Sequence, residues 1–256
     1  MMTQKAKAEL FRDLHIKGNP LILYNIWDAG SAKAIEEAGA KAIATGSWSV
    51  AAANGFKDGE EMPLDLALTN LERIVASVSA PVTIDLEGGY TTDNSQLKEN
   101  IKKAIAAGAV GINFEDQIVG GEGLYSVQDQ CSRIEALREA AEQTSIPLFI
   151  NARTDVFLKT YPASHDEAQL EEAAARAAAY AKAGASGFFA PGLRDAEFIK
   201  KLSELSPIPL NIMILPDTPP ELANLGVARI SYGPEPYRRV MESLKEAGRK
   251  AFSDIS

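Results

Sequence analysis

The chain has 256 residues, of which 46% are hydrophobic and 24% charged, as in an ordinary globular protein. Its net charge of −9 at pH 7 argues against nucleic acid and anionic membranes as partners, because both select basic patches. No run reaches the ~18 apolar residues of a membrane span, and the start lacks a hydrophobic signal region. With a single cysteine, Cys131, no internal disulfide can form. We therefore expect a cytoplasmic protein with no membrane partner.

Short apolar strands alternate with helices after a polar first segment of helical spacing. Strands are predicted at 21–25, 42–46, 82–87, 111–116, 148–153, 187–191, 209–214 and 229–233. Helices are predicted at about 29–39, 64–79, 94–108, 126–143, 166–183, 195–205, 219–225 and 235–252. The strands are apolar throughout, as in a parallel sheet that is covered on both faces.

The same joint recurs between helix and strand. In 35–46, 105–116 and 181–192 an Ala-rich helix ends at Gly and an apolar strand follows. Eight such βα units in about 250 residues match a single (β/α)₈ barrel that spans residues 1–256 as one domain. A doubly wound sheet is the alternative, but it usually carries a Gly-rich phosphate turn after its first strand, and "NIWDAGSA" is no such turn.

Polar residues gather where the predicted strands end, which is where barrel enzymes place their active sites. In chain order these are Tyr24, Asn25, Asp28, the turn "TGSWS", Asp85, Glu87, Glu115, Asp116, Asn151, Arg153, Asp155, Asn211 and Tyr232. A single strand-end carboxylate can simply cap the next helix. Arg153 can be a structural partner of the acids, and "GSWS" can be a plain turn or a set of backbone amides that approach an anion.

The carboxylates predict a metal site. Asp85 and Glu87 should point the same way because side chains alternate along a strand, and Glu115 ends the neighbouring strand. Three converging carboxylates repel one another unless a cation neutralises them. His15 and His165 lie at no strand end, so an oxygen ligand set is expected, which selects Mg²⁺ or Mn²⁺ over Zn²⁺. Cys131 falls inside the predicted helix 126–143 and is expected to pack there.

The motifs "NIWDAGSA", "TGSWSVAAANGFKDGE", "TIDLEGGY", "INFEDQ", "NARTD" and "LGVARISYGPEPYR" resemble the isocitrate lyase / phosphoenolpyruvate mutase superfamily over almost the whole chain. The resemblance implies that amides of Gly46, Ser47 and Trp48 hold a keto-acid carboxylate. It implies metal-site acids at Asp58, Asp85, Glu87 and Glu115, with Asp85 the direct ligand; position 87 is commonly Asp in the superfamily. Substrate contacts are implied for Arg153 and Asn211, and Tyr24 is a further candidate.

The segment 117–126, "QIVGGEGLYS", departs from the superfamily. Lyase members carry an acidic Cys here, and mutase members carry a Lys-Thr-Asn-Ser type loop. The lyase glutamate after the sixth strand is replaced by Pro191. The chain therefore resembles a shorter, phosphonomutase-like branch. Its glycines suit a mobile lid, whose remaining polar side chains are Glu122, Tyr125 and Ser126.

The retained parts suit an α-keto acid. Mg²⁺ would stabilise an enolate as a Lewis acid, and Arg153 would add a second positive charge. General acid catalysis contributes roughly 10²–10⁴ in rate. Because segment 117–126 lacks the proton donor of the lyase members, reactions that depend on such a donor are disfavoured. We expect C–C cleavage or decarboxylation of a small keto acid of the oxaloacetate type, with Arg153, Asp58, Glu122 and Tyr125 as the catalytic candidates.

Three alternatives stay open. One is a lyase acting on a 2-hydroxy di- or tricarboxylate, with Glu122 or Tyr125 as proton donor. The second is phosphonomutase-like or methylisocitrate-lyase-like activity on another substrate. The third is a keto-acid-binding protein without catalysis, which Asp58 and Arg153 argue against. The resemblance also implies a homo-oligomer, a dimer or tetramer. Relatives often exchange their last helix, but the short tail after 235–252 disfavours an exchange here.

Overall fold

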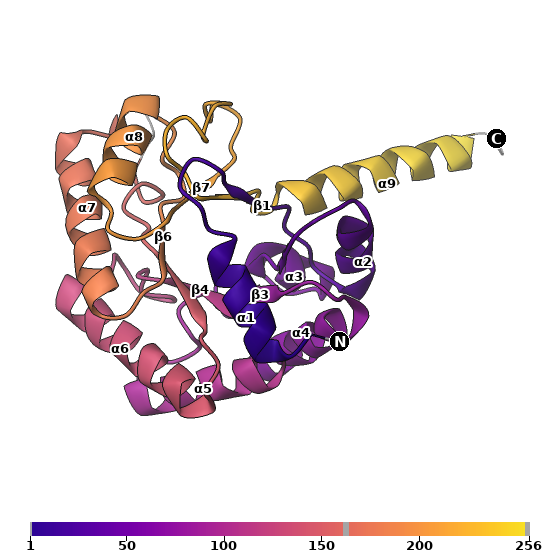
Figure 1. Cartoon of the computed structure of the whole chain (residues 1–256). Coiled ribbons are helices and arrows are strands. Elements are labelled where there is room, and N and C mark those ends of the chain that lie inside the picture. The colour runs from indigo at the N-terminus through magenta and orange to yellow at the C-terminus, as the bar shows by residue number, and fades with distance from the viewer. Residues whose placement is uncertain (1, 161–163, 254–256) are drawn as a thin grey trace.

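A computed structural model describes residues 2–160 and 164–253. Eight parallel strands stand side by side in the order β1-β8-β7-β6-β5-β4-β3-β2 and curve into a nearly closed barrel (Figure 1). The strands are β1 (Leu21–Leu23), β2 (Ile43–Ala44), β3 (Val82–Asp85), β4 (Gly111–Glu115), β5 (Phe149–Arg153), β6 (Gly187–Phe189), β7 (Leu210–Met213) and β8 (Arg229–Ser231). A parallel bridge between Ile26 and Thr45 joins the chain after β1 to the chain after β2. The predicted (β/α)₈ barrel is confirmed.

The helices are α1 (Gln4–Asp13), α2 (Ala29–Glu37), α3 (Ser47–Ala53), α4 (Leu64–Ser77), α5 (Asn94–Ala106), α6 (Val127–Thr144), α7 (Glu167–Lys182), α8 (Ala196–Leu205) and α9 (Glu235–Ser253). No helix in the described part of the chain is both long and apolar enough to cross a membrane.

Two predictions of local structure are wrong. Residues 47–53, predicted as part of a loop, form the short helix α3. The helix predicted at 219–225 is instead a series of turns, in which the N–H of Leu225 donates to Leu222 O (3.2 Å). Pro219 and Pro220 have no N–H, and Gly226 adopts φ +80° immediately afterwards. Too few residues lie between these signals to nucleate an α-helix.

The hydrophobic core lies mostly between the strands and the outer helices. Outward residues such as Ile84, Ile112 and Phe114 are buried there against helical side chains. A second cluster fills the N-terminal end of the barrel, where Phe11 of α1 packs edge-on against Phe149 of β5 with ring centroids 5.5 Å apart. Helix α1 therefore closes the bottom of the barrel and leaves the opposite end open.

Above this apolar floor the barrel interior is polar. Inward positions carry Thr83, Asn113, Asn151, Asn211 and Arg229, all buried. Barrels of this type usually fill these layers with branched apolar side chains. Glycine at 111 and 187 makes room beside the polar groups: a Cβ at Gly187 would lie 2.8 Å from Phe149 and 2.9 Å from the side-chain oxygen of Asn151.

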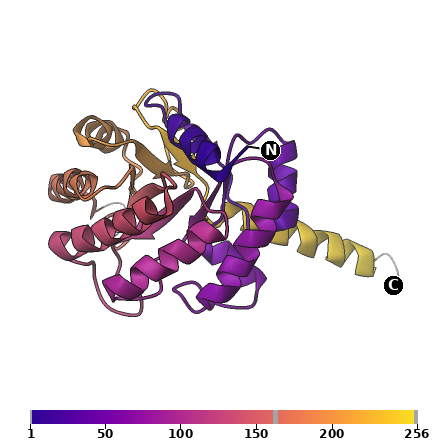
Figure 2. The ribbon, with the colours of Figure 1, turned by 60° about the horizontal axis from the view of Figure 1, so that its bottom comes forward.

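Helix α9 does not pack on its own barrel. It projects from the body in both views (Figures 1 and 2). Within the described chain, Pro236 is its one buried residue, while Val240 and Leu244 are 47% and 62% exposed. The strand β1, next to β8, is left uncovered on its outer side, where Ile22 is 54% exposed.

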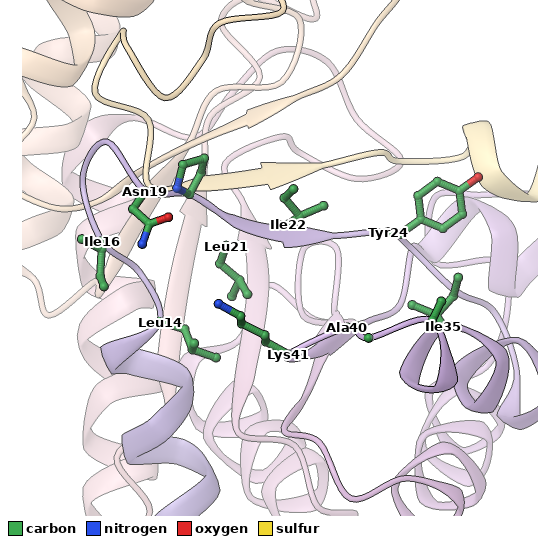
Figure 3. Close-up of a pocket in the computed structure, with 12 residues that line it drawn as sticks. Leu14, Ile16, Asn19, Leu21, Ile22, Tyr24, Ile35, Ala40 and Lys41 are labelled. Carbon is green, nitrogen blue, oxygen red and sulfur yellow. The ribbon is translucent and has the colours of Figure 1, made fainter.

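An apolar groove marks the place that a helix would cover. It has a volume of about 620 Å³. Figure 3 shows Leu14, Ile16, Ile22 and Ile35 along it, with Tyr24 at one end. This groove lies outside the barrel, away from the carboxylates that end the strands.

Candidate active site

A cavity of about 160 Å³ opens at the carboxyl ends of the strands. Seven of the residues that the sequence indicated line it: Asn25, Gly46, Ser47, Trp48, Asp58, Asp85 and Arg153. The remaining lining residues are Asn113, Leu158, Phe189, Pro191, Met213, Ser231, Gly233 and Pro234. The cavity therefore combines two acids and one cation with a mostly apolar upper wall.

Asp85, the last residue of β3, lies at the base of this cavity. Its Oδ2 accepts a hydrogen bond from the N–H of Ser47 (3.2 Å), and its own N–H donates to Thr45 Oγ1 (2.9 Å). Ser47 begins α3, so the first turn of this helix presents backbone N–H groups to the site. The other carboxylate oxygen, Oδ1, is buried and has no hydrogen-bond partner within residues 2–160 and 164–253. It is available to a cation or to a water molecule.

Glu87 is positioned differently from the expectation. Strand β3 ends at Asp85, and Glu87 adopts φ +52°, so the strand alternation does not extend to it. Its Oε2 accepts from the N–H groups of Gly59 (2.8 Å) and Glu60 (2.9 Å). Glu87 thus fixes the loop that carries Asp58, and it does not line the cavity with Asp58 and Asp85.

The acids around Asp85 are buried close together and raise one another's pKa. Burial raises the pKa of Glu87 to about 8, and Asp58 and Asp85 raise it further in the same direction. Burial, followed by the charge of Asp85, also raises the pKa of Asp58. A cation among these carboxylates would offset their mutual repulsion.

Arg153 is held from two sides. Its Nε and Nη2 bind the two oxygens of Asp155 (2.6 and 2.9 Å), and its Nη1 lies 2.7 Å from Glu115 Oε2. Burial alone would lower the pKa of Arg153, but Glu115 and Asp155 raise it well above its usual range. The guanidinium is therefore fixed in place, stays charged and still lines the cavity.

The residues fit a hydrated divalent cation better than a closed metal cage. Among the residues that the structure describes, no three His, Cys, Asp or Glu side chains are grouped to hold a metal directly. Mg²⁺ commonly keeps several waters and takes one or two carboxylates from the protein. Asp85, with a buried and unpartnered oxygen, would be the direct ligand, and Asp58, Glu87 and Glu115 would act through water.

Residues 11–252 match the family described as phosphoenolpyruvate phosphomutase. The chain belongs to the phosphoenolpyruvate phosphomutase family. A crystal structure from Burkholderia cenocepacia J2315, provisionally described as a phosphonomutase, is 48% identical with a TM-score of 0.95 and covers 97% of this chain and 100% of that one. An uncharacterised protein of Mycobacterium tuberculosis is 31% identical, covering 95% of this chain and 89% of its own length. The 2-methylisocitrate lyase of Escherichia coli K12 is 28% identical, covering 82% and 70%.

In this family member the segment after β4 forms a small hairpin. Gln117 and Leu124 make an antiparallel bridge, and the N–H of Ile118 donates to Gly123 O (3.2 Å). Glu122 is exposed near its tip. The guanidinium of Arg133 lies over the ring of Tyr125, with its Cζ 4.5 Å from the ring centroid. The hairpin is thus folded against α6 and does not cover Asp85.

Six of the predicted site residues do not line the cavity that Asp85 and Arg153 share: Glu87 and Glu115, described above, and Glu122, Tyr125, Tyr24 and Asn211. Glu122 is exposed, and Tyr125 lines a separate space of about 120 Å³ beside Tyr90. Tyr24 lies at the end of the outer groove. Asn211 is buried and exchanges hydrogen bonds with Ser231 (2.9 and 3.2 Å). Ser126 caps α6 by accepting from the N–H of Asp129 (3.1 Å).

Asp116 and Arg229 show what the sequence did not reveal. Asp116, adjacent to Glu115, faces away from the cavity and binds Arg176 (3.1 Å) and Tyr180 (2.8 Å) of α7. Arg229 is 1% exposed inside the barrel. The adjacent acids in "FED" must point to opposite sides of a strand, which was a usable signal for Asp116. No pattern in the sequence indicates that Arg229 points into the barrel, because this orientation follows from the pairing of β8 with β7.

Proposed function

We propose that this protein is a Mg²⁺-dependent enzyme that cleaves or decarboxylates a small α-keto acid. The observation that carries the proposal is the buried, unpartnered Oδ1 of Asp85 in one cavity with the fixed cation of Arg153. Bound there, Mg²⁺ would supply a Lewis acid for the oxygens of a keto acid. The family membership supports carbon–carbon lyase or mutase chemistry as the class.

The protein's own groups have separable roles. Arg153 remains charged and would offset the negative charge that develops on a keto oxygen. The N–H of Ser47, which contacts Asp85 here, would orient a ligand carboxylate. Asp58 lines the same cavity and would exchange a proton with the substrate.

The size of the cavity favours a small acid. Its 160 Å³ correspond to about five water molecules at ~30 Å³ each. Phosphonopyruvate hydrolase, which shares the fold with a TM-score of 0.84 at 20% identity, was solved with oxalate and Mg²⁺. An oxaloacetate decarboxylase of Bradyrhizobium is 23% identical over 232 residues. Both support a keto acid as the first substrate to test.

The decisive experiment measures pyruvate formation from oxaloacetate with MgCl₂, above the rate of the metal ion without protein. Wild type should show turnover that Asp85→Asn and added EDTA abolish. Equal rates for wild type and Asp85→Asn would refute the proposal. Tight keto-acid binding in calorimetry without product would indicate the non-catalytic alternative.

The 2-hydroxy acid lyase alternative is tested through the hairpin. If that reaction is the real one, Tyr125→Phe or Glu122→Gln should abolish cleavage of a di- or tricarboxylate that wild type cleaves. Unchanged turnover in both variants would exclude these two groups as proton donors.

For the assembly, and contrary to the expectation from the short tail, we infer a homo-oligomer in which α9 of one copy fills the outer groove of another. Val240 and Leu244 lie four residues apart and therefore share one face of α9. The groove is lined by apolar residues such as Ile16, Ile22 and Ile35. Helix α9 begins four residues after β8 ends and projects outward, so it leaves its own groove uncovered. A second copy supplies an occupant of matching shape and polarity.

Mixing two variants tests this assembly. Leu244→Asp places a charge on the apolar face of α9, and Ile22→Asp places a charge in the apolar groove. Each variant alone should therefore be monomeric by light scattering. An equimolar mixture should recover dimers, because one helix and one groove remain intact. Arg249→Gln, which makes the same change in net charge on the opposite face of α9, is the matched control and should stay oligomeric. A wild-type monomer at all concentrations would refute the assembly.

A further inference from the structure

The side-chain amide of Asn113 has a defined orientation. Asn113 lies on β4 beside Asp85 of β3, is 5% exposed and lines the cavity. One of its side-chain atoms lies 2.9 Å from Arg229 Nη2. A guanidinium only donates hydrogen bonds, so this atom must be the oxygen, Oδ1. The same oxygen accepts from Asn151 Nδ2 (2.9 Å).

The side-chain oxygen of Asn113 accepts from two donors, Asn151 and Arg229, so only the amino group of Asn113 is left to face the cavity. Asn113 Nδ2 makes no hydrogen bond to any part of the chain that the structure describes, and it is not among the fully enclosed unpartnered atoms. A donor that faces a site for an anionic acid, with no protein partner of its own, is a group prepared for a ligand oxygen.

Arg229 is an unusual residue to find inside a barrel. It is 1% exposed and forms no ion pair with any described carboxylate. Its Nε and Nη1 are buried without partners in the described chain. Burial lowers the pKa of Arg229 to about 9, and Asp85 opposes this effect, so the group is still charged at pH 7. A buried charge without a carboxylate partner opposes folding, which points to a role in the site above it.

We propose that Asn113 is a substrate-binding residue whose Nδ2 donates to an oxygen of the anionic ligand, and that Arg229 is the positioning residue that fixes this orientation. The inference rests on the proposed function and names a contact within it. Arg229 also places a positive charge one hydrogen bond below the cavity, on the opposite side of Asn113 from the ligand. The pair selects an anion that brings an acceptor oxygen to the floor of the cavity.

Calorimetric titration of oxalate at saturating MgCl₂, with Mg²⁺ alone titrated separately, tests the proposal. Asn113→Asp keeps an acceptor for Arg229 and Asn151 but replaces the donor with a negative charge. Oxalate should bind roughly 10- to 100-fold more weakly, as for the loss of a hydrogen bond to a charged group. Binding of Mg²⁺ alone should not weaken, and the melting temperature should not fall, because Arg229 gains a carboxylate partner. Asn224→Asp, an exposed change of the same charge, is the control.

Two variants of Arg229 isolate the positioning role. Arg229→Met should weaken oxalate binding several-fold. It should not weaken Mg²⁺ binding, because the loss of the positive charge of Arg229 adds no repulsion toward Mg²⁺. Arg229→Lys keeps a donor for Asn113 and should recover most of the affinity. A general folding defect would weaken both ligands in both variants, and that result would overturn the inference.

The outcomes also separate this inference from the proposed function. Wild type that binds no oxalate in the presence of Mg²⁺ would refute both. Wild type that binds oxalate, with unchanged affinity in Asn113→Asp, would refute the role of Asn113 and leave the proposed function standing. Should Asn113→Asp fail to fold, the comparison of Arg229→Met with Arg229→Lys decides.

Discussion

Replacing Glu87 with Gln should remove the loss of stability that ionisation of this carboxyl causes at high pH in the metal-free protein. In the metal-free protein the carboxyl of Glu87 is buried, and its pKa is raised from 4.5 to about 8. A raised pKa means that the folded protein binds the proton more tightly than the unfolded chain. The corresponding stability is fully present below pH 4.5 and is lost as the pH rises through about 8.

The size of the effect follows from that difference. Each pKa unit corresponds to about 1.36 kcal/mol, so the change from 4.5 to about 8 amounts to at most ~5 kcal/mol. Gln carries no charge at any pH, and its side-chain oxygen can still accept from the N–H groups of Gly59 and Glu60. Glu87→Gln should therefore match wild type near pH 5 and exceed its free energy of unfolding by ~1–4 kcal/mol at pH 9.

Urea unfolding in EDTA from pH 5 to 9 measures this difference. Glu122→Gln, which removes an exposed carboxylate, should leave the pH dependence unchanged. Added Mg²⁺ should stabilise wild type at pH 8 more than it stabilises Glu87→Gln, because the cation needs the ionised acid. A Glu87→Gln protein that is less stable than wild type at pH 9, or that keeps the wild-type slope, would refute the reasoning.

Three further predictions concern other parts of the molecule. Arg153→Met should lower kcat by ~10²–10³ because a fixed positive charge is lost from the cavity, whereas steady-state kinetics with less than a tenfold change would contradict its role. Asp116→Asn should destabilise the fold by ~1–3 kcal/mol in urea unfolding, because Arg176 loses its buried carboxylate partner and keeps only the half-exposed Glu172. Gly187→Ala should cost ~1–3 kcal/mol, since the new Cβ would lie 2.8 Å from Phe149; wild-type stability would show that the barrel interior can adjust.

The pattern of apolar strands and glycine-ended helices was sufficient to predict the barrel. The Gly that ends three of the helices and the strand after it are local signals, so they can be seen without tertiary structure. The failures occurred where local signals were short or conflicting. Helix α3 has seven residues and an N-cap glycine without a side-chain cap, and the segment after Pro219 and Pro220 has too few residues for a helix.

The candidate site was predictable in part for a related reason. Asp85 and Arg153 end strands that the sequence marked clearly, and strand ends of a parallel barrel meet at one mouth. Glu87 could not be placed, because its positive φ breaks the alternation on which the prediction depended. The orientation of Asn113 depends on Arg229, 116 positions later in the chain, and no periodicity connects the two.

The way α9 leaves the barrel has a mechanical consequence. Gly233 and Pro234, which precede the helix, form part of the cavity wall. In the first turn of α9, Tyr237 lies edge-on to Trp48 with ring centroids 5.9 Å apart, and the guanidinium of Arg238 lies 4.7 Å from the Trp48 ring. Tyr237 also lies edge-on to Trp27, with ring centroids 5.0 Å apart, so a displacement of α9 acts on both tryptophans. In the proposed assembly, dilution that separates the copies should therefore alter both the tryptophan fluorescence and the specific activity.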